Sequence, residues 1–193
     1  MSGRPLPTGR RPGFPVALTG TPGAGKSAVA AALRTEYRSV EVGKLAARLG
    51  AGRKVGRGWV VDLDRLRVAL RRPGALDGVD VIVGHLAHLL PVPRAIVLRC
   101  HPRELERRLA RAHRGRAADR RANYVSEALD LVLAEALERH LPVREIDSSG
   151  RRVPVVAGAV RRALRERRWG RQGRRIDWLA DPTVTAHLLE PPG

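Results

Sequence analysis

Short apolar runs alternate with amphipathic stretches along most of the chain. The apolar runs predict strands at residues 14–18, 40–42, 59–61, 79–83, 95–99 and 143–146. Apolar residues recur at every third or fourth position between them, which predicts helices at residues 26–38, 43–49, 62–71, 102–109, 122–139 and 155–168. The glycine-rich basic stretch 50–58 predicts a loop, and the polar stretch 110–121 predicts an exposed lid.

This alternation predicts an α/β fold, with a five-stranded, mostly parallel sheet that helices cover on both faces. Ligands of such folds bind outside the carboxyl ends of the strands. We therefore expect the loops after Leu18, Val61, Val83 and Arg99 to surround one cleft.

The composition suits one globular domain. With 193 residues, 43% of them hydrophobic, the chain can bury one full core. No apolar run approaches the roughly 20 residues that span a bilayer, and no signal-peptide pattern is present, so we expect a cytoplasmic protein without membrane contact. The single cysteine, Cys100, excludes an internal disulfide and is expected in the core.

The chain is strongly basic. Its 37 Lys and Arg residues exceed its 19 acidic residues, for a formal net charge of +18, and all but Lys26, Lys44 and Lys54 are arginines. Such a charge favours binding to RNA or DNA, although a compositional preference for arginine explains it equally well. The stretch 151–175 is accordingly either an RNA-facing patch, on which Trp169 could stack with a base, or a solvated helix face and a flexible tail.

Residues 20–27, Gly-Thr-Pro-Gly-Ala-Gly-Lys-Ser, match the P-loop pattern G-x-x-x-x-G-K-[ST] at every position, between a predicted strand and a predicted helix. The glycines let the backbone curl, so that its N–H groups point at phosphate oxygens. Lys26 would contact the β and γ phosphates, and the Ser27 hydroxyl would bind Mg²⁺. A lysine in this arginine-rich chain is informative, because a compact ammonium fits where a guanidinium does not. The motif predicts binding of ATP with Mg²⁺.

Further motifs follow the P-loop in a specific order: VDLDRL, VIVGHLAHLLP, IVLRCHPRELERRL, NYVSEALDLVLAEAL, EID and, in the tail, IDWL. Together with LTGTPGAGKS they cover about residues 14–180. In this order they resemble the adenylate kinase isoenzyme 6 family, which includes the coilin-interacting nuclear ATPase, and its archaeal branch most of all.

The resemblance implies transfer of the γ-phosphoryl group of Mg-ATP to AMP or another nucleoside monophosphate, together with ATPase activity. It also implies a role in rRNA processing during small ribosomal subunit maturation, with a small-subunit ribosomal protein and rRNA as partners. It assigns the ATP phosphates to Gly20, Gly23, Gly25, Lys26, Ser27 and the backbone at Ala28. The chain then divides into a flexible basic arm (1–13), a kinase domain (14–168) with a monophosphate-binding region (43–66) and a lid (110–121), and a basic tail (169–193).

The chain departs from the family pattern at two places. Val83 stands where the family usually has an acidic residue, two positions before His85, so Asp62, Asp64 or Asp80 would have to supply the magnesium or water-positioning carboxylate. The lid segment is also one residue longer than usual. As a result, Arg111 and Arg114 compete for the contact with phosphate.

Five other residues have candidate roles. His85 is expected beside the γ-phosphate or the attacking group, so that Lys26, His85 and Arg114 form the candidate catalytic set. His88 is expected to be structural, because two histidines without a nearby cysteine or paired acids do not make a zinc site. Arg99 is either a catalytic cation at a strand end or a solvated rim residue, and Glu127 and Glu135 are expected to pair with lid arginines.

Three other functions compete with a nucleoside monophosphate kinase. The first is an ATP-hydrolysing ribosome assembly factor with incidental kinase turnover, which the missing acid before His85 favours. The second is a small-metabolite kinase of the shikimate or gluconate type, which the absence of a Gly-Gly-Gly acceptor loop disfavours. The third is a pure RNA-binding module, which does not explain the P-loop.

Overall fold

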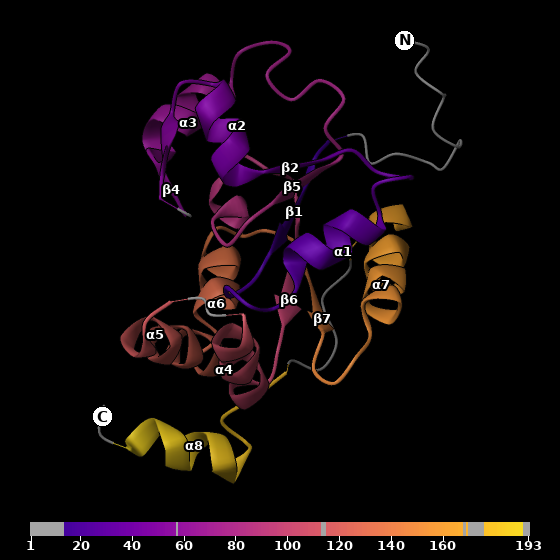
Figure 1. Ribbon diagram of the computed structural model, residues 1–193. Coiled ribbons are helices and arrows are strands. Elements are labelled where there is room, and N and C mark those ends of the chain that lie inside the picture. The colour runs from indigo at the N-terminus through magenta and orange to yellow at the C-terminus, as the bar shows by residue number, and fades with distance from the viewer. Residues whose placement is uncertain (1–13, 57, 113–114, 168, 170–175, 191–193) are drawn as a thin grey trace.

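The computed structural model describes residues 14–56, 58–112, 115–167, 169 and 176–190, so the predicted arm 1–13 lies outside the described residues. The chain forms a five-stranded parallel sheet in the order β2-β5-β1-β6-β7 (Figure 1). Its strands are β1 (Val16–Thr19), β2 (Ser39–Glu41), β5 (Val81–Val83), β6 (Ala95–Arg99) and β7 (Val143–Asp147). The predicted α/β architecture is confirmed.

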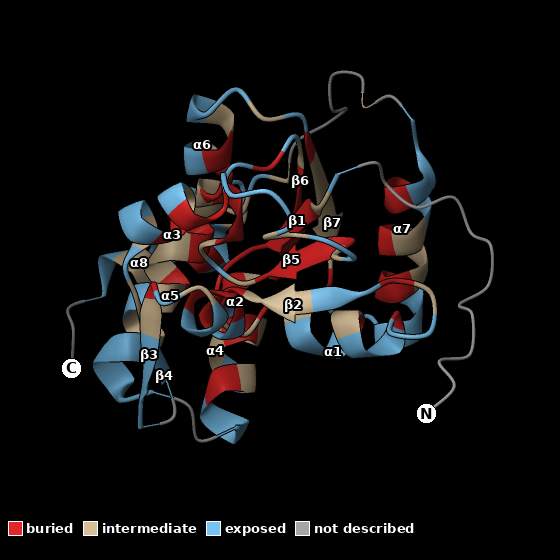
Figure 2. Cartoon of the chain, turned by 90° about the horizontal axis from the view of Figure 1, so that it is seen from above, coloured by how far each residue is buried: buried red, intermediate tan, exposed pale blue. Residues whose placement is uncertain are grey.

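Helices cover both faces of the sheet because successive side chains of each strand alternate between the faces. Val16 and Leu18 of β1 pack with α1 (Lys26–Ala32), α4 (Pro102–Arg111) and α7 (Val153–Arg165). Ala17 faces the other way, toward α2 (Val42–Arg48) and α3 (Leu63–Ala69). Figure 2 shows the resulting buried strands at the centre and the exposed outer surfaces of the helices.

The expectation of a loop at residues 50–58 is wrong, because this stretch contains the first strand and the turn of a β-hairpin. Strand β3 (Gly52–Val55) pairs antiparallel with β4 (Gly58–Val61), and Gly56 adopts φ 56° at the turn between them. Residues 59–61 are extended, as expected, but they belong to this hairpin and not to the main sheet. The loop after Val61 is therefore not among the loops at the carboxyl edge of the main sheet, and the loop after β7 is.

The expected helix 122–139 is two helices, α5 (Ala117–Ala128) and α6 (Leu131–Glu138). Asp130 has φ 57°, a left-handed conformation that interrupts the helical hydrogen bonds. Helix α5 also begins within the predicted lid, where the Asp119 carboxylate accepts a hydrogen bond from the Arg116 backbone N–H at 2.8 Å. Since α4 continues to Arg111, most of the segment 110–121 that the structure describes is helical.

The predicted tail contains a packed element, α8 (Pro182–Leu189). Val184 is fully buried and packs against Tyr124 and Ala128 of α5, with Trp178 at the edge of this cluster. The Asp181 carboxylate caps α8 by accepting from the Thr183 backbone N–H at 2.8 Å. Among the described residues, no helix combines the length and the apolar character that crossing a bilayer requires.

Candidate active site

The P-loop leaves the carboxyl end of β1 and ends at Ser27, within the first turn of α1. Gly20 has φ 130°, and a Cβ at this position would lie 2.2 Å from the Leu98 carbonyl oxygen of β6. Gly23 has φ 96°, and its Cβ would lie 3.0 Å from Leu109 Cγ of α4. Gly20 and Gly23 are therefore required by the packing of the loop against its neighbours.

Gly25 serves a different purpose. It has φ 98°, but a Cβ would meet no atom within 4 Å, so the space beside it is open. The next residues, Ser27 and Ala28, are exposed, and they place a hydroxyl and a backbone N–H at the start of α1. A curled backbone with open space, an ammonium and an alcohol is the donor set that the phosphates of a nucleotide with Mg²⁺ require, so the residues present fit this group.

Lys26 lies across the loop. Its Nζ donates to the Gly20 carbonyl at 2.6 Å and to the Thr21 carbonyl at 2.9 Å. Burial lowers the pKa of Lys26 from 10.5 to about 8, and the Glu127 carboxylate limits this decrease. The ammonium is charged at neutral pH. An anion bound in the loop would compensate the ammonium for the hydration that it loses through burial.

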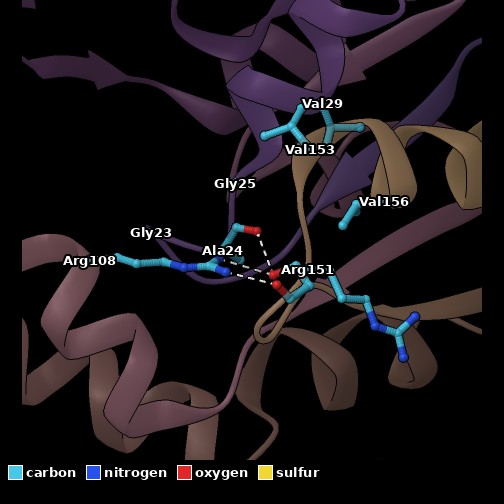
Figure 3. A pocket seen from close by; sticks show the side chains of 9 residues that line it. Gly23, Ala24, Gly25, Val29, Arg108, Arg151, Val153 and Val156 are labelled. Atoms are coloured by element: carbon cyan, nitrogen blue, oxygen red, sulfur yellow. Dashed lines mark hydrogen bonds between the residues drawn. The ribbon is translucent and has the colours of Figure 1, made fainter.

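A pocket of about 310 Å³ continues from the P-loop (Figure 3). The Ser148 hydroxyl donates to the Ala24 carbonyl at 3.0 Å, and Arg108 of α4 donates to the Ser148 carbonyl at 2.8 Å. The pocket is lined by Gly23, Ala24, Gly25, Val29, Arg108, Ser148, Arg151, Val153 and Val156. It combines apolar walls with the side chains of two arginines, Arg108 and Arg151, and opens beside the phosphate cradle, which suits a flat ring system attached to phosphates.

Three pocket residues, Arg108, Ser148 and Arg151, are not among the site residues expected from the sequence. The signal that could have found them is the rule about strand carboxyl ends, because Ser148 directly follows β7 in the main sheet. The expectation named the loop after Val61, which follows the hairpin strand β4, and not the loop after β7.

The two histidines after β5 lie close to the loop but differ in environment. His88 is fully buried and structural, as expected: Nδ1 lies 2.9 Å from Thr19 Oγ1, and Nε2 lies 2.9 Å from Glu135 Oε2. His85 is exposed, and desolvation together with the nearby Lys26 ammonium lowers the pKa of its ring. At neutral pH His85 is therefore an uncharged hydrogen-bonding group near Lys26.

The three candidate replacements for the missing acid lie in different places. Val83 itself is 3% exposed and belongs to the core. Asp80 precedes β5, at the opposite edge of the sheet from the P-loop, and accepts from the Arg38 backbone N–H at 2.8 Å. Asp62 caps α3 by accepting from the Arg65 backbone N–H at 2.9 Å, and Asp64 is exposed and pairs with Arg67 at 2.8 Å. The parallel register therefore excludes Asp80 as the magnesium or water-positioning carboxylate, because it places this residue at the edge of the sheet away from the P-loop.

Arg99 is neither a solvated rim residue nor a free catalytic cation, and both expectations are corrected. It is 1% exposed, and it donates to Glu127 at 2.8 Å, to Glu145 at 2.8 Å and to Asp130. Glu127 and Glu135 also do not pair with any lid arginine that the structure describes: Glu127 pairs with Arg99, and Glu135 with His88. A buried guanidinium requires several acceptors, and these come from α5 (Glu127), from the break between α5 and α6 (Asp130) and from β7 (Glu145), which meet only in the folded chain.

The lid residues are only partly described. Arg111 is the last residue of α4 and is exposed, whereas Arg114 lies outside the described residues. Cys100 follows β6 in the core, as expected, and burial raises the pKa of its thiol to about 12. Within the described part of the chain, no group of three or more His, Cys, Asp or Glu side chains could hold a metal ion directly.

The parallel sheet, the P-loop and the adjoining pocket define a P-loop nucleotide-binding protein. The family described as "AAA domain" matches residues 16–131. Two similar relatives have the name "Putative adenylate kinase". The protein from Thermococcus onnurineus is 35% identical over 84% of this chain and 90% of its own, and that from Archaeoglobus fulgidus is 38% identical over 86% and 92%.

A third relative of the same name, from Natronomonas pharaonis, is 37% identical over 90% of this chain and 99% of its own length. The chain belongs to this family of archaeal adenylate kinase-like proteins. Among solved structures, shikimate kinase from Bacteroides thetaiotaomicron aligns with a TM-score of 0.48 and 19% identity, over 77% of this chain and 97% of that one.

Proposed function

We propose that the protein is a nucleoside monophosphate kinase, which transfers the γ-phosphoryl group of ATP to AMP or a related monophosphate. One observation carries the proposal: the pocket of about 310 Å³ shares Gly23, Ala24 and Gly25 with the phosphate cradle, so one ligand can fill both. The names of the relatives point to the same reaction. The closer assignment to the adenylate kinase isoenzyme 6 family is also a proposal, which rests on the order of the sequence motifs.

In this proposal the backbone at Gly20, Gly23, Gly25 and Ala28 holds the ATP phosphates, and the nucleoside fills the pocket. Lys26, whose pKa is about 8, neutralises charge on the transferred group at neutral pH. Mg²⁺ held by the Ser27 hydroxyl would neutralise further negative charge when bound.

The acceptor is proposed to bind over residues 43–66, on α2 and the β3–β4 hairpin. Trp59 of β4 packs against Gly43 of α2, where a Cβ on Gly43 would lie 2.3 Å from Trp59 Cγ. Neutral His85 would hydrogen-bond the transferred phosphoryl group or the attacking acceptor oxygen. Arg114 or Arg111 would stabilise the transition state from the lid, which would exclude water as it closes.

A coupled assay of ADP formation tests the proposal. ATP is supplied with AMP, CMP, GMP, UMP or their deoxy forms, with and without Mg²⁺. We expect Mg²⁺-dependent phosphorylation of at least one acceptor and its loss in Lys26→Ala. If no monophosphate is phosphorylated by folded protein, the kinase assignment is wrong.

The second candidate function is ATP hydrolysis that drives small ribosomal subunit maturation, with a small-subunit ribosomal protein and rRNA as partners. The observation that favours it is Val83, which is buried where a carboxylate would accelerate phosphoryl transfer. The net charge of +18 suits an RNA partner. ATPase activity that rises severalfold with a ribosomal protein–RNA complex, and RNA affinity that falls steeply with salt, would support this function. Equal ATPase rates with and without that complex would contradict it.

A further inference from the structure

A buried carboxylate touches the P-loop from a helix that is distant in sequence. The Thr21 hydroxyl, inside the P-loop, donates to Glu127 Oε2 of α5 at 2.5 Å, across 106 positions of the chain. Thr21 is 1% exposed and Glu127 is 2% exposed, so water does not compete for this bond. The Thr21 carbonyl also accepts from Lys26 Nζ at 2.9 Å. Thr21 therefore connects Glu127 to the lysine that would meet the ATP phosphates.

The other carboxylate oxygen of Glu127 is held by three donors. Oε1 accepts from Arg99 Nε at 2.8 Å, from the Cys100 backbone N–H at 3.1 Å and from Trp178 Nε1 at 3.1 Å. Arg99 also pairs with Asp130 and Glu145, so neutralising this guanidinium does not require Glu127. The orientation of Glu127 toward Thr21 is therefore set jointly by the end of β6 and by the C-terminal segment.

The C-terminal segment, defined here as residues 176–190, is held in place by its own contacts. The Trp178 ring meets His101 edge-on, with 5.3 Å between the ring centroids, and His101 Nε2 lies 3.0 Å from Asp181 Oδ2. The Tyr124 hydroxyl of α5 donates to the Val184 carbonyl at 3.2 Å. These contacts keep the Trp178 indole N–H directed at Glu127.

We propose that Glu127 is a positioning residue of the phosphate cradle, which holds the P-loop through Thr21 most firmly when the C-terminal segment is docked and Trp178 completes its hydrogen bonds. Binding of the nucleotide is thereby coupled to docking of this segment. Displacing the segment would remove one of the three donors that hold Glu127 Oε1, so Glu127 would be held less firmly toward Thr21 and the support that orders Lys26 would weaken. The inference rests on the proposed function only in assuming that ATP binds at the P-loop.

The test uses full-length variants that each remove one hydrogen bond. Thr21→Val removes the hydroxyl at constant size, and Trp178→Phe removes the indole N–H but keeps an aromatic ring. We expect each to weaken ATP binding about tenfold, the loss for one hydrogen bond to a charged group. In the kinase assay, KM for ATP should rise while kcat at saturating ATP stays near the wild-type value, whereas a partly unfolded enzyme would lose kcat at constant KM.

Two matched variants serve as controls. Thr21→Ser restores the hydroxyl and should restore ATP affinity. Trp169→Phe removes an indole N–H that donates to the Ala163 carbonyl at 3.1 Å, in another part of the C-terminal region, and should bind ATP like the wild type. In the double variant Thr21→Val with Trp178→Phe, the loss should be close to that of the larger single variant, because both act through Glu127.

The outcomes separate this inference from the proposed function. If wild type binds ATP and Lys26→Ala does not, but Trp178→Phe binds like the wild type, the coupling is wrong and the P-loop assignment stands. Losses that multiply in the double variant would also overturn the coupling, since independent sites add in free energy. If wild type and Lys26→Ala both fail to bind ATP, the proposed function itself fails. Circular dichroism at the assay temperature confirms that each variant is folded.

Discussion

The P-loop and the buried cluster around Arg99 meet at one hydrogen bond, between Thr21 and Glu127, yet the two regions are built differently. The P-loop is a continuous run of residues whose glycines and lysine indicate its shape and chemistry. The cluster brings Arg99, Glu127 and Trp178 together from a strand, a helix and the C-terminal segment. Its members resemble surface residues when taken singly, and only their packing makes them a unit. Changes in the loop should therefore alter ligand binding most, and changes in the cluster should alter stability most.

Lys26→Ala should give the largest effect, a loss of roughly a hundredfold or more in kcat/KM, because it removes charge stabilisation of the transferred group.

The stability of the ligand-free protein should change in the opposite direction when the ammonium is removed. The folded pKa of about 8 lies below the unfolded value of 10.5, so at neutral pH the ammonium favours the unfolded state. Lys26→Met should raise the free energy of unfolding of the ligand-free protein by about 1–3 kcal/mol. Kinetics and urea titration measure the two effects, and a stability loss in Lys26→Met would contradict the second.

Arg99→Leu should be the largest change on the cluster side, with a loss of about 3–5 kcal/mol of unfolding free energy, because it leaves buried carboxylates without their cation. The matched control is Arg165→Leu, in which a 54% exposed side chain loses its pair with Glu36 and the expected change is below about 1 kcal/mol. Urea titration measures both variants. Equal losses would show that burial does not distinguish the two guanidinium groups.

Two alanine substitutions within the P-loop should separate its packing from its binding. Gly20→Ala places a Cβ 2.2 Å from the Leu98 carbonyl and should cost about 3 kcal/mol or more of stability. Gly25→Ala meets no atom within 4 Å, so its stability loss should be only about 1–2 kcal/mol, for the positive φ. Its ATP affinity should nevertheless fall about tenfold or more, because the methyl group occupies the open side of the cradle. Thermal unfolding and ATP titration of both variants measure this difference, and an unchanged ATP affinity in Gly25→Ala would contradict it.

The pH dependence of ATP binding tests the environment of Lys26. Below a pKa of about 8 the free protein already carries the ammonium, so this residue should add no pH dependence. Above that value the neutral amine must gain a proton before it binds phosphate, and the affinity should fall, by about fivefold between pH 8 and 9 at most. Lys26→Arg should bind ATP more weakly, because a guanidinium fits the loop less well, but it stays charged over this range and its affinity should show no such decrease. A flat wild-type profile up to pH 9.5 would contradict the lowered pKa.

The smallest effect should be at Cys100, whose thiol has a pKa of about 12 because it is buried. A thiol reagent at pH 8 should leave the folded protein unmodified, whereas the urea-unfolded chain should react with one equivalent. Mass spectrometry gives the extent of modification. Rapid labelling of the folded protein would show that the core around β6 opens readily.

Much of the fold could be predicted from local patterns. The apolar runs identified all five strands of the main sheet, and the P-loop motif located the glycine-rich turn between β1 and α1. The hairpin at 52–61 was missed because glycines and basic residues dominate its sequence, while its strands are stabilised by pairing with each other. The break at Asp130 was missed because the apolar spacing continues through it, although the backbone turns there to a φ of 57°.

The sequence by itself determined the parts whose physical cause lies within a few residues: the glycine-permitted curl of the P-loop, the single ammonium at Lys26, and the alternation of strands and helices. The tertiary structure alone decided which charges are buried, because the identity of Arg99 or Glu127 does not specify its neighbours. It also assembled the pocket beside the P-loop from α1, α4, α7 and the loop after β7, and it brought the Trp178 indole N–H within hydrogen-bond distance of Glu127. Desolvation and hydrogen bonding between distant residues appear only when the chain is packed, and so local patterns cannot report them.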